Sequence, residues 1–229
     1  MRRRAPLEVH GVKLPREALD LSPAIARAIS RGRYERHEVE LMRAILVQGD
    51  RLLEIGGGLG VVSAAAALTG KPAAIHTYEA HPDMPALIAK THAANDLSGR
   101  VEVTHGAVVG DGAPAEVTFN VRRAFWASST RSPPKGRRSR VVSVKAFPIN
   151  DLVARHKPTV ISMDVEGSEL DILPGATLEG VRHVVMELHQ NVTGGRGVKA
   201  VFDAMSAADF HYDPKFSEGA VVTFTRVQD

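Results

Sequence analysis

The sequence predicts an α/β fold in which a mostly parallel sheet carries helices on both faces. The first observation is that short apolar segments alternate with helix-like segments from residue 51 to residue 225. The second is that 229 residues, of which 44% are hydrophobic, suffice for one main core. The third is that we find neither internal repeats nor a second domain beyond a short lead-in. A β-hairpin insertion interrupts the alternation once.

The first fifty residues are expected to form a helical lead-in that packs on the core. Residues 23–30 and 35–47 have apolar positions at helical spacing, and Gly49 follows where a left-handed residue ends a helix. The apolar positions of the second helix include Val39, Met42, Ile45 and Leu46. Residues 51–229 are expected to form the main domain.

The alternation of the main domain begins with three strands and two helices. The strands are residues 51–55, 74–78 and 101–105, and the helices are residues 59–69 and 82–95. After the insertion, the pattern resumes with helices at residues 149–155, 168–173 and 198–208 and strands at residues 159–165, 181–188 and 220–225. In a sheet of this kind, ligands bind at the carboxyl ends of the parallel strands.

Residues 107–147 form the insertion. Residues 116–122 and 141–147 have strand character, whereas residues 127–136 are rich in serine and proline and suit neither strand nor helix. This pattern predicts a β-hairpin with a mobile, basic tip. Phe125 and Trp126 could cover an acceptor there, while Arg131 or Arg137 holds an anionic group; a solvated surface hairpin is the alternative.

Composition excludes several classes of protein. The chain has no cysteine, which excludes a disulfide scaffold, a zinc ribbon and thiol catalysis. Its longest apolar stretch, residues 61–68, is too short for a membrane helix, and no apolar segment follows the basic start as in a signal peptide. The net charge of +3 argues against a nucleic-acid binder. We therefore expect a cytoplasmic protein.

A glycine-rich turn follows the first strand of the main domain. Glu54, Gly56, Gly58 and Gly60 give the pattern acidic-x-G-x-G-x-G, and Val61 excludes the dinucleotide pattern G-x-G-x-x-G. This form suits a ligand without pyrophosphate, whose cationic amino group the acidic residue could receive. Glu79, at the end of the next strand, is placed to accept hydrogen bonds from ribose hydroxyls. The alternative is a structural turn with a solvated glutamate.

Acidic side chains also end the strand at residues 159–165. Asp164 and Glu166 are two residues apart and share a face while the strand lasts. Burying two carboxylates at the ligand edge is costly unless they are paired, which favours a functional role. Glu166 could instead cap the next helix, and for Glu169 we expect only a charge that complements that helix dipole.

Glu187 and His189 end the following strand and again share a face. A carboxylate and an imidazole can serve as general base and orienting partner. With Asp164 they could instead bind a divalent cation, and His189 could also be a structural histidine. Because no second cluster of ligands supports a metal, we predict no metal site.

These segments together resemble an FkbM-type S-adenosylmethionine-dependent methyltransferase. The resemblance rests on the glycine motif, on Tyr78-Glu79-Ala80-His81-Pro82, on Asp164-Val165-Glu166-Gly167-x-Glu169 and on Glu187-Leu188-His189. It runs from about Tyr34-Glu35 to His189. Thr91 departs from the family pattern, which has an asparagine there, and the basic loop is longer than a minimal hairpin.

The resemblance implies a Rossmann-like, seven-stranded class I methyltransferase sheet, with residues 51–229 as the domain that binds S-adenosylmethionine. By position, Glu54 and the glycines from Gly56 to Gly60 would hold the methionine end of this cofactor and Glu79 its ribose. Gly106 and Ala107 would border the adenine. The resemblance also implies a small-molecule or glycan acceptor.

We therefore expect an O-methyltransferase that acts on a hydroxyl of a sugar, glycolipid or natural-product-like molecule. Asp164 is the first candidate for the base or acceptor-orienting residue and His189 the second, with Glu166 and Glu187 in support. A nucleic-acid methyltransferase that uses the basic loop is an alternative, which the balanced charge argues against. A nucleotide-binding module without turnover is the other.

Overall fold

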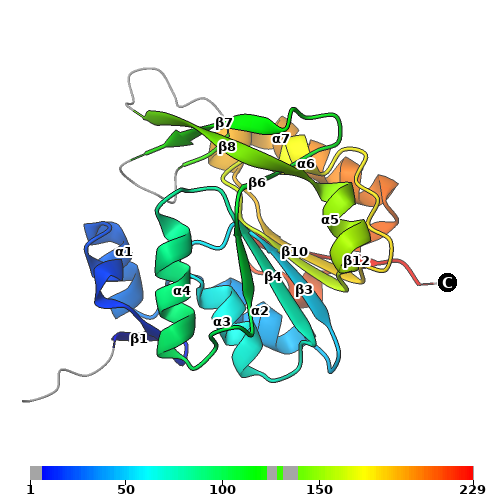
Figure 1. Ribbon diagram of the computed structural model, residues 1–229. Helices are drawn as coiled ribbons and strands as arrows, with labels where there is room; N and C mark the ends of the chain where they lie inside the picture. Colours follow the sequence, from blue (N-terminus) through cyan, green and yellow to red (C-terminus); the bar gives the residue numbers. More distant parts are fainter. Residues whose placement is uncertain (1–6, 123–127, 131–138, 229) are drawn as a thin grey trace, which may run out of the picture.

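A seven-stranded sheet forms the centre of the protein (Figure 1). The computed structural model describes residues 7–122, 128–130 and 139–228. The strands of the sheet are β3 (Arg51–Ile55), β4 (Ala74–Glu79), β5 (Glu102–His105), β9 (Val160–Met163), β10 (His183–Glu187), β11 (Phe210–Tyr212) and β12 (Val221–Arg226). Their order is β11-β12-β10-β9-β3-β4-β5, and five neighbouring strands from β10 to β5 are parallel. The predicted α/β class is confirmed, with β12 antiparallel to both of its neighbours.

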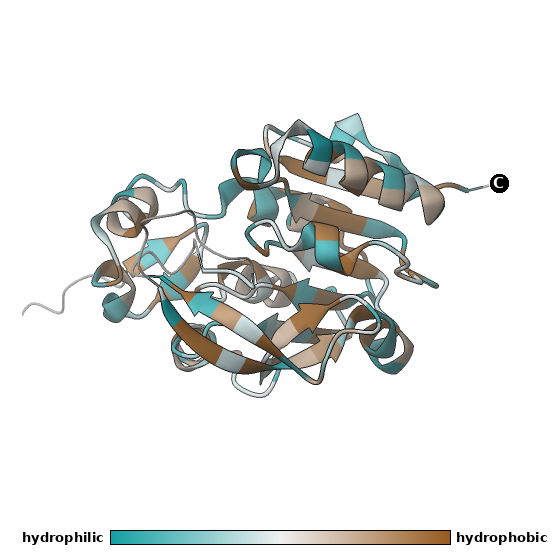
Figure 2. Cartoon of the chain, turned by 90° about the horizontal axis from the view of Figure 1, so that it is seen from above, coloured by the Kyte–Doolittle hydropathy of each residue, from teal (hydrophilic) through white to brown (hydrophobic). Residues whose placement is uncertain are grey.

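Helices cover both faces of this sheet, as the sequence predicts. They are α1 (Pro23–Ser30), α2 (Arg36–Ile45), α3 (Val61–Leu68), α4 (Met84–Ala94), α5 (Ile149–His156), α6 (Glu169–Ile172) and α7 (Gln190–Ala207). Successive residues of β3 point to opposite faces, so Leu52 packs with α2 and α3 while Leu53 packs with α5 and α7. Figure 2 shows hydrophobic residues prominent on the strands, whereas the helices carry both hydrophobic and hydrophilic residues. In the described part of the chain, no helix combines the length and apolar character that crossing a bilayer requires.

The lead-in is only partly helical, which corrects the sequence prediction. α1 and α2 form where expected, but a hairpin of β1 (Leu7–Val9) and β2 (Val12–Leu14) precedes them, followed by the short 3-10 helix η1 (Arg16–Leu19). His10 and Gly11 both have positive φ, as two-residue hairpin turns require. Strands of three residues are too short to produce a readable alternation. The lead-in shares one apolar cluster with α3 and with residues of β3 and β4.

The insertion forms a second, three-stranded sheet of β6 (Ala107–Val109), β8 (Arg140–Pro148) and β7 (Glu116–Val121), in that order. β7 and β8 pair antiparallel, which confirms the predicted hairpin, whereas β6 was not predicted. The expected basic tip and the aromatic pair Phe125-Trp126 lie outside the described residues. Two further corrections concern the end of the chain: α7 begins at Gln190 rather than at residue 198, with a kink at Gly194, and β11 forms an edge strand of the main sheet where no strand was predicted. The short 3-10 helix η3 (Pro214–Phe216) follows β11.

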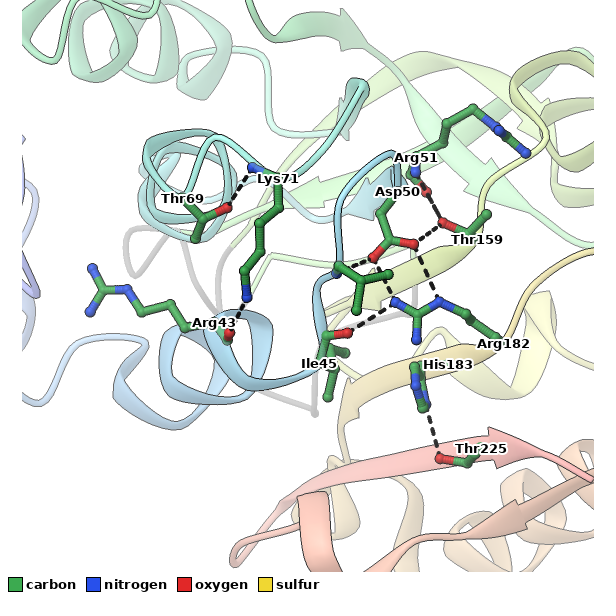
Figure 3. Close-up of polar contacts among 11 residues, drawn as sticks. Arg43, Ile45, Asp50, Arg51, Thr69, Lys71, Thr159, Arg182, His183 and Thr225 are labelled. Carbon is green, nitrogen blue, oxygen red and sulfur yellow. Dashed lines mark hydrogen bonds and ion pairs between the residues drawn. The ribbon is translucent and has the colours of Figure 1, made fainter.

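Asp50, directly before β3, ties together the starting ends of three neighbouring strands (Figure 3). Its carboxylate accepts hydrogen bonds from the backbone N–H of Val47 and from Thr159 Oγ1, both at 2.7 Å. Two nitrogens of Arg182 reach the same carboxylate at 2.6 and 3.2 Å, and Arg182 also donates to the carbonyl of Ile45 at 2.9 Å. Because Thr159 precedes β9 and Arg182 precedes β10, one carboxylate joins β3, β9 and β10 to the end of α2.

The charge of Asp50 depends on these partners. The side chain is only 3% exposed, and burial alone would raise its pKa. The hydrogen bonds from Arg182, Val47 and Thr159 outweigh burial and hold the pKa of Asp50 below its ordinary value. The ionised carboxylate is therefore the form that stabilises the fold at neutral pH.

We expect Asp50→Asn to lower the free energy of unfolding by roughly 3 kcal/mol, because Arg182 loses its countercharge. This value lies at the lower end of the cost of breaking a buried ion pair, because the Arg182 side chain is 30% exposed and water partly compensates its charge. Urea denaturation at pH 7 measures it. As a control, Asp203→Asn removes the exposed pair with Lys199 and should cost less than about 0.5 kcal/mol. Equal losses in the two variants would contradict the role of Asp50.

Candidate functional site

A cavity of about 530 Å³ opens at the carboxyl ends of the parallel strands. The sequence-predicted residues that line it are Gly56, Gly58, Glu79, Gly106, Ala107, Asp164, Glu166 and Glu187. Glu54, Gly60 and His189 are not among the residues that line it. The cavity has the size of a small-molecule site and lies at the ligand-binding edge of an α/β sheet.

The glycine-rich turn passes directly over the end of β9. Gly56 has a φ of +89°, and a Cβ at this position would lie 1.8 Å from the carbonyl oxygen of Asp164. Gly58 and Gly60 also have positive φ, and Gly60 is the N-cap of α3. The turn therefore needs glycine both for backbone conformation and for close approach.

Glu79 forms one polar wall of the cavity. Its Oε2 accepts a hydrogen bond from the N–H of Gly58 at 2.9 Å, and its Oε1 accepts one from the N–H of His81 at 2.6 Å. Burial raises the pKa of Glu79, and these backbone donors oppose the effect. The carboxylate is thus held between the glycine turn and the end of β4. The backbone carbonyl of Glu79 also accepts a hydrogen bond from the N–H of Gly106 at 2.9 Å.

Glu54 has its partners inside the protein. The side chain is 2% exposed, Oε1 accepts from the N–H of Ser63 at 2.9 Å, and Oε2 accepts from Thr77 Oγ1 at 2.6 Å. Burial raises its pKa to about 7 despite these bonds. In the structure Glu54 ties α3 to β3 and β4, and the amino-group role expected for it remains a prediction.

The lead-in contributes lining residues that the sequence analysis did not single out. Tyr34 and Glu35 border the cavity at the start of α2. A Cβ on Gly58 would lie 2.9 Å from Glu35 Oε1 and 3.1 Å from the Tyr34 hydroxyl, so both side chains contact the glycine turn. Only the first residues of the family resemblance, Tyr34-Glu35, could have drawn attention to them.

His189 is the centre of the second polar group. Its Nε2 lies 3.4 Å from Asp164 Oδ1, 3.6 Å from Glu166 Oε2 and 4.0 Å from Glu187 Oε2. Its Nδ1 is 2.8 Å from Glu169 Oε1, within hydrogen-bond distance. The sequence expectation for Glu169 is therefore incomplete: this buried carboxylate orients the imidazole as well as starting α6. The structure brings together all four candidate catalytic residues.

The charges of this group depend on one another. Burial alone would lower the pKa of His189, but the hydrogen bond to Glu169 and the charges of Asp164 and Glu166 raise it to about 9. Burial raises the pKa of Glu166 to about 7, and burial with the nearby Glu187 raises that of Asp164. Asp164 Oδ1 is buried without a hydrogen-bond partner, whereas its side chain as a whole is 39% exposed. Asp164 thus joins the buried imidazole to the cavity.

The same side chains have the donor atoms of a metal site. One oxygen each of Asp164 and Glu166 and one nitrogen of His189 lie within 4.8 Å of one another. Oxygen and imidazole ligands suit a divalent cation. The sequence alternative combined Asp164 and His189 with Glu187, whereas this cluster has Glu166 in that place.

The insertion contacts this group through hydroxyls. Ser168 Oγ lies 3.2 Å from Ser129 Oγ and 2.7 Å from Thr130 Oγ1, and Ser128 and Thr130 line the cavity. The segment 128–130 therefore borders the cavity beside Ser168.

We expect Gly56→Ala to lower the free energy of unfolding by at least about 4 kcal/mol, or to prevent folding altogether, because the added methyl group would overlap the Asp164 carbonyl. Gly70→Ala is the matched control: Gly70 has a φ of +69° and nothing within 4 Å of a Cβ. The control should cost about 1–2 kcal/mol from backbone strain alone. Thermal and urea unfolding compare the two, and equal losses would show that the close approach is unimportant.

Comparisons with known proteins agree with this geometry. The sequence model of the FkbM methyltransferase domain matches residues 54–212, more than half of the chain. A search of curated proteins gives no match.

Solved structures share the fold at low sequence identity. Precorrin-6y C5,15-methyltransferase from Geobacter metallireducens is 12% identical, with a TM-score of 0.51 over 84% of this chain and 87% of that protein. Methyltransferase FkbM from Methylobacillus flagellatus is 13% identical, with a TM-score of 0.50 over 88% of this chain and 53% of that one. Ribosomal protein L11 methylase from Lactobacillus delbrueckii is 10% identical, with a TM-score of 0.50 over 86% and 80%. These likenesses support the Rossmann-like fold alone.

Proposed function

The chain belongs to the FkbM methyltransferase family, and we propose that it transfers a methyl group from S-adenosylmethionine to a hydroxyl of a sugar, glycolipid or natural-product-like small molecule. One observation carries the proposal: a single cavity joins the glycine turn and Glu79 at one end to Asp164 and Glu166 at the other. Donor-binding and proton-accepting groups therefore share one site.

The residues present fit the methyl donor. Gly56 and Gly58 line the cavity without side chains of their own, so a ligand can approach the backbone of the turn, which suits the methionine end. Glu79 would accept hydrogen bonds from the ribose, and Gly106 and Ala107 would border the adenine. When bound, S-adenosylmethionine supplies a methyl group on a sulfonium, so the leaving group needs no protein acid.

Asp164 is the proposed base. Because burial raises its pKa, its carboxylate is a stronger proton acceptor than an exposed aspartate and can take the proton of an acceptor hydroxyl. His189, with a pKa of about 9, is an imidazolium at neutral pH and stabilises the charge on Asp164 rather than acting as the base itself. Glu169 fixes the imidazole from behind, and Glu166 and Glu187 help to hold the acceptor. The proposal includes a cytoplasmic location, which rests on the composition of the chain.

Calorimetric titration of S-adenosylhomocysteine tests the donor site. We expect micromolar binding that Glu79→Ala weakens at least about tenfold, since a carboxylate that accepts hydrogen bonds from hydroxyls is lost. NAD should give no signal, because the turn lacks the dinucleotide pattern. Absence of S-adenosylhomocysteine binding, or equal binding of NAD, would overturn the proposed function.

We expect Asp164→Asn to lower turnover by about 100- to 10,000-fold, the usual contribution of a general base, while the affinity for S-adenosylhomocysteine stays within about twofold. Turnover is measured with an acceptor found by screening hydroxyl compounds. The exposed Asp203→Asn variant serves as the control. Full turnover in Asp164→Asn would refute the base assignment. Nucleic-acid binding that falls steeply with salt would instead indicate a polynucleotide acceptor.

A further inference from the structure

We propose that Glu35, a residue of the lead-in, receives the ammonium group of the methionine end of S-adenosylmethionine, in place of Glu54. This inference rests on the proposed function. It makes the start of α2 part of the donor site, although the domain predicted to bind the cofactor begins after it.

The position of Glu35 supports this role. Glu35 is the N-cap of α2 in a left-handed conformation, with φ 50° and ψ 34°. This conformation is uncommon for a residue other than glycine and persists where the surroundings fix it. Its Oε1 approaches Gly58 so closely that a Cβ there would lie 2.9 Å away. The carboxylate therefore lies against the turn that is proposed to hold the methionine end.

The hydrogen bonds of the two glutamates differ. Both oxygens of Glu54 already accept hydrogen bonds, from Ser63 and Thr77. Glu54 borders only a minor cavity of about 10 Å³, whereas Glu35 borders both that cavity and the large one. Glu35 Oε2 is buried and has no hydrogen-bond partner. An ammonium group brings three donors, and this oxygen is a buried acceptor available to one of them.

The negative charges around Glu35 also favour the binding of a cation. Burial raises the pKa of Glu35, the charges of Glu38, Glu54 and Asp164 raise it further, and a hydrogen bond with Tyr34 opposes them. Burying a carboxylate beside other carboxylates is unfavourable unless a positive group accompanies it. The ammonium of the cofactor supplies that charge when it binds.

Calorimetry with two ligands separates this role from a general effect. S-adenosylhomocysteine carries the ammonium, whereas 5′-methylthioadenosine has the same adenine and ribose without the amino-acid part. We expect Glu35→Gln to weaken S-adenosylhomocysteine binding by about 10- to 100-fold, the usual value of a charge-assisted hydrogen bond, and to change methylthioadenosine binding less than twofold. Retained methylthioadenosine binding also reports that the variant is folded.

Two further variants complete the comparison. Glu40→Gln, on the exposed side of α2, should change neither affinity, and Glu79→Ala should weaken both ligands because both contain the ribose. A selective loss in Glu54→Gln, with Glu35→Gln unaffected, would overturn the inference and assign the ammonium to Glu54. Equal losses of both ligands in Glu35→Gln would overturn it as well. Failure of the wild-type protein to bind either ligand would instead refute the proposed function.

Discussion

The buried carboxylate of Asp50 is the constraint on which the rest of the structure depends. Parallel strands leave their amino ends without hairpin connections, so something else must hold these ends in register. Here the Asp50 side chain accepts hydrogen bonds from Thr159 before β9, from Arg182 before β10 and from the N–H of Val47 just after α2. With one end of the sheet fixed in this way, the carboxyl ends of the same strands are positioned relative to one another, and that is where the cavity opens.

The two ends of the cavity differ in the kind of polar group that lines them. At the end proposed to bind the donor, the backbone N–H groups of Gly58 and of His81, which follows β4, hold the carboxylate of Glu79 in place. At the end proposed to bind the acceptor, carboxylates surround His189, and against the effect of burial the hydrogen bond to Glu169 and the charges of Asp164 and Glu166 raise the pKa of the imidazole. Rigid backbone donors suit binding, whereas adjustable carboxylates with raised pKa values suit proton transfer.

Sequence reasoning located six of the seven strands of the main sheet and most of the cavity because both follow from local patterns, whereas the three-residue edge strand β11 was not predicted. Strand-end residues such as Glu79, Asp164 and Glu187 fall at the ligand edge once the strands are known to be parallel. Glu35 was not identified, because its place beside Gly58 depends on how the lead-in packs, which no short-range pattern encodes. Glu169 was interpreted as a helix-end charge, since its contact with His189 joins residues that are far apart in the chain. The hairpin of β1 and β2 was missed because its strands are so short.

The close contact between Gly56 and Asp164 limits how this enzyme can diversify. β3 and β9 continue their pairing into the turn, where the N–H of Asp164 donates to the carbonyl of Ile55 at 2.9 Å. The proposed donor site and the proposed acceptor site therefore share one segment of backbone, and a substitution in one is expected to disturb the other. The insertion contacts the segment after β9 at Ser168, through the hydroxyls of Ser129 and Thr130. Under the proposed function, substitutions at Ser129 and Thr130 can therefore change acceptor preference while leaving the pairing of β3 and β9 intact.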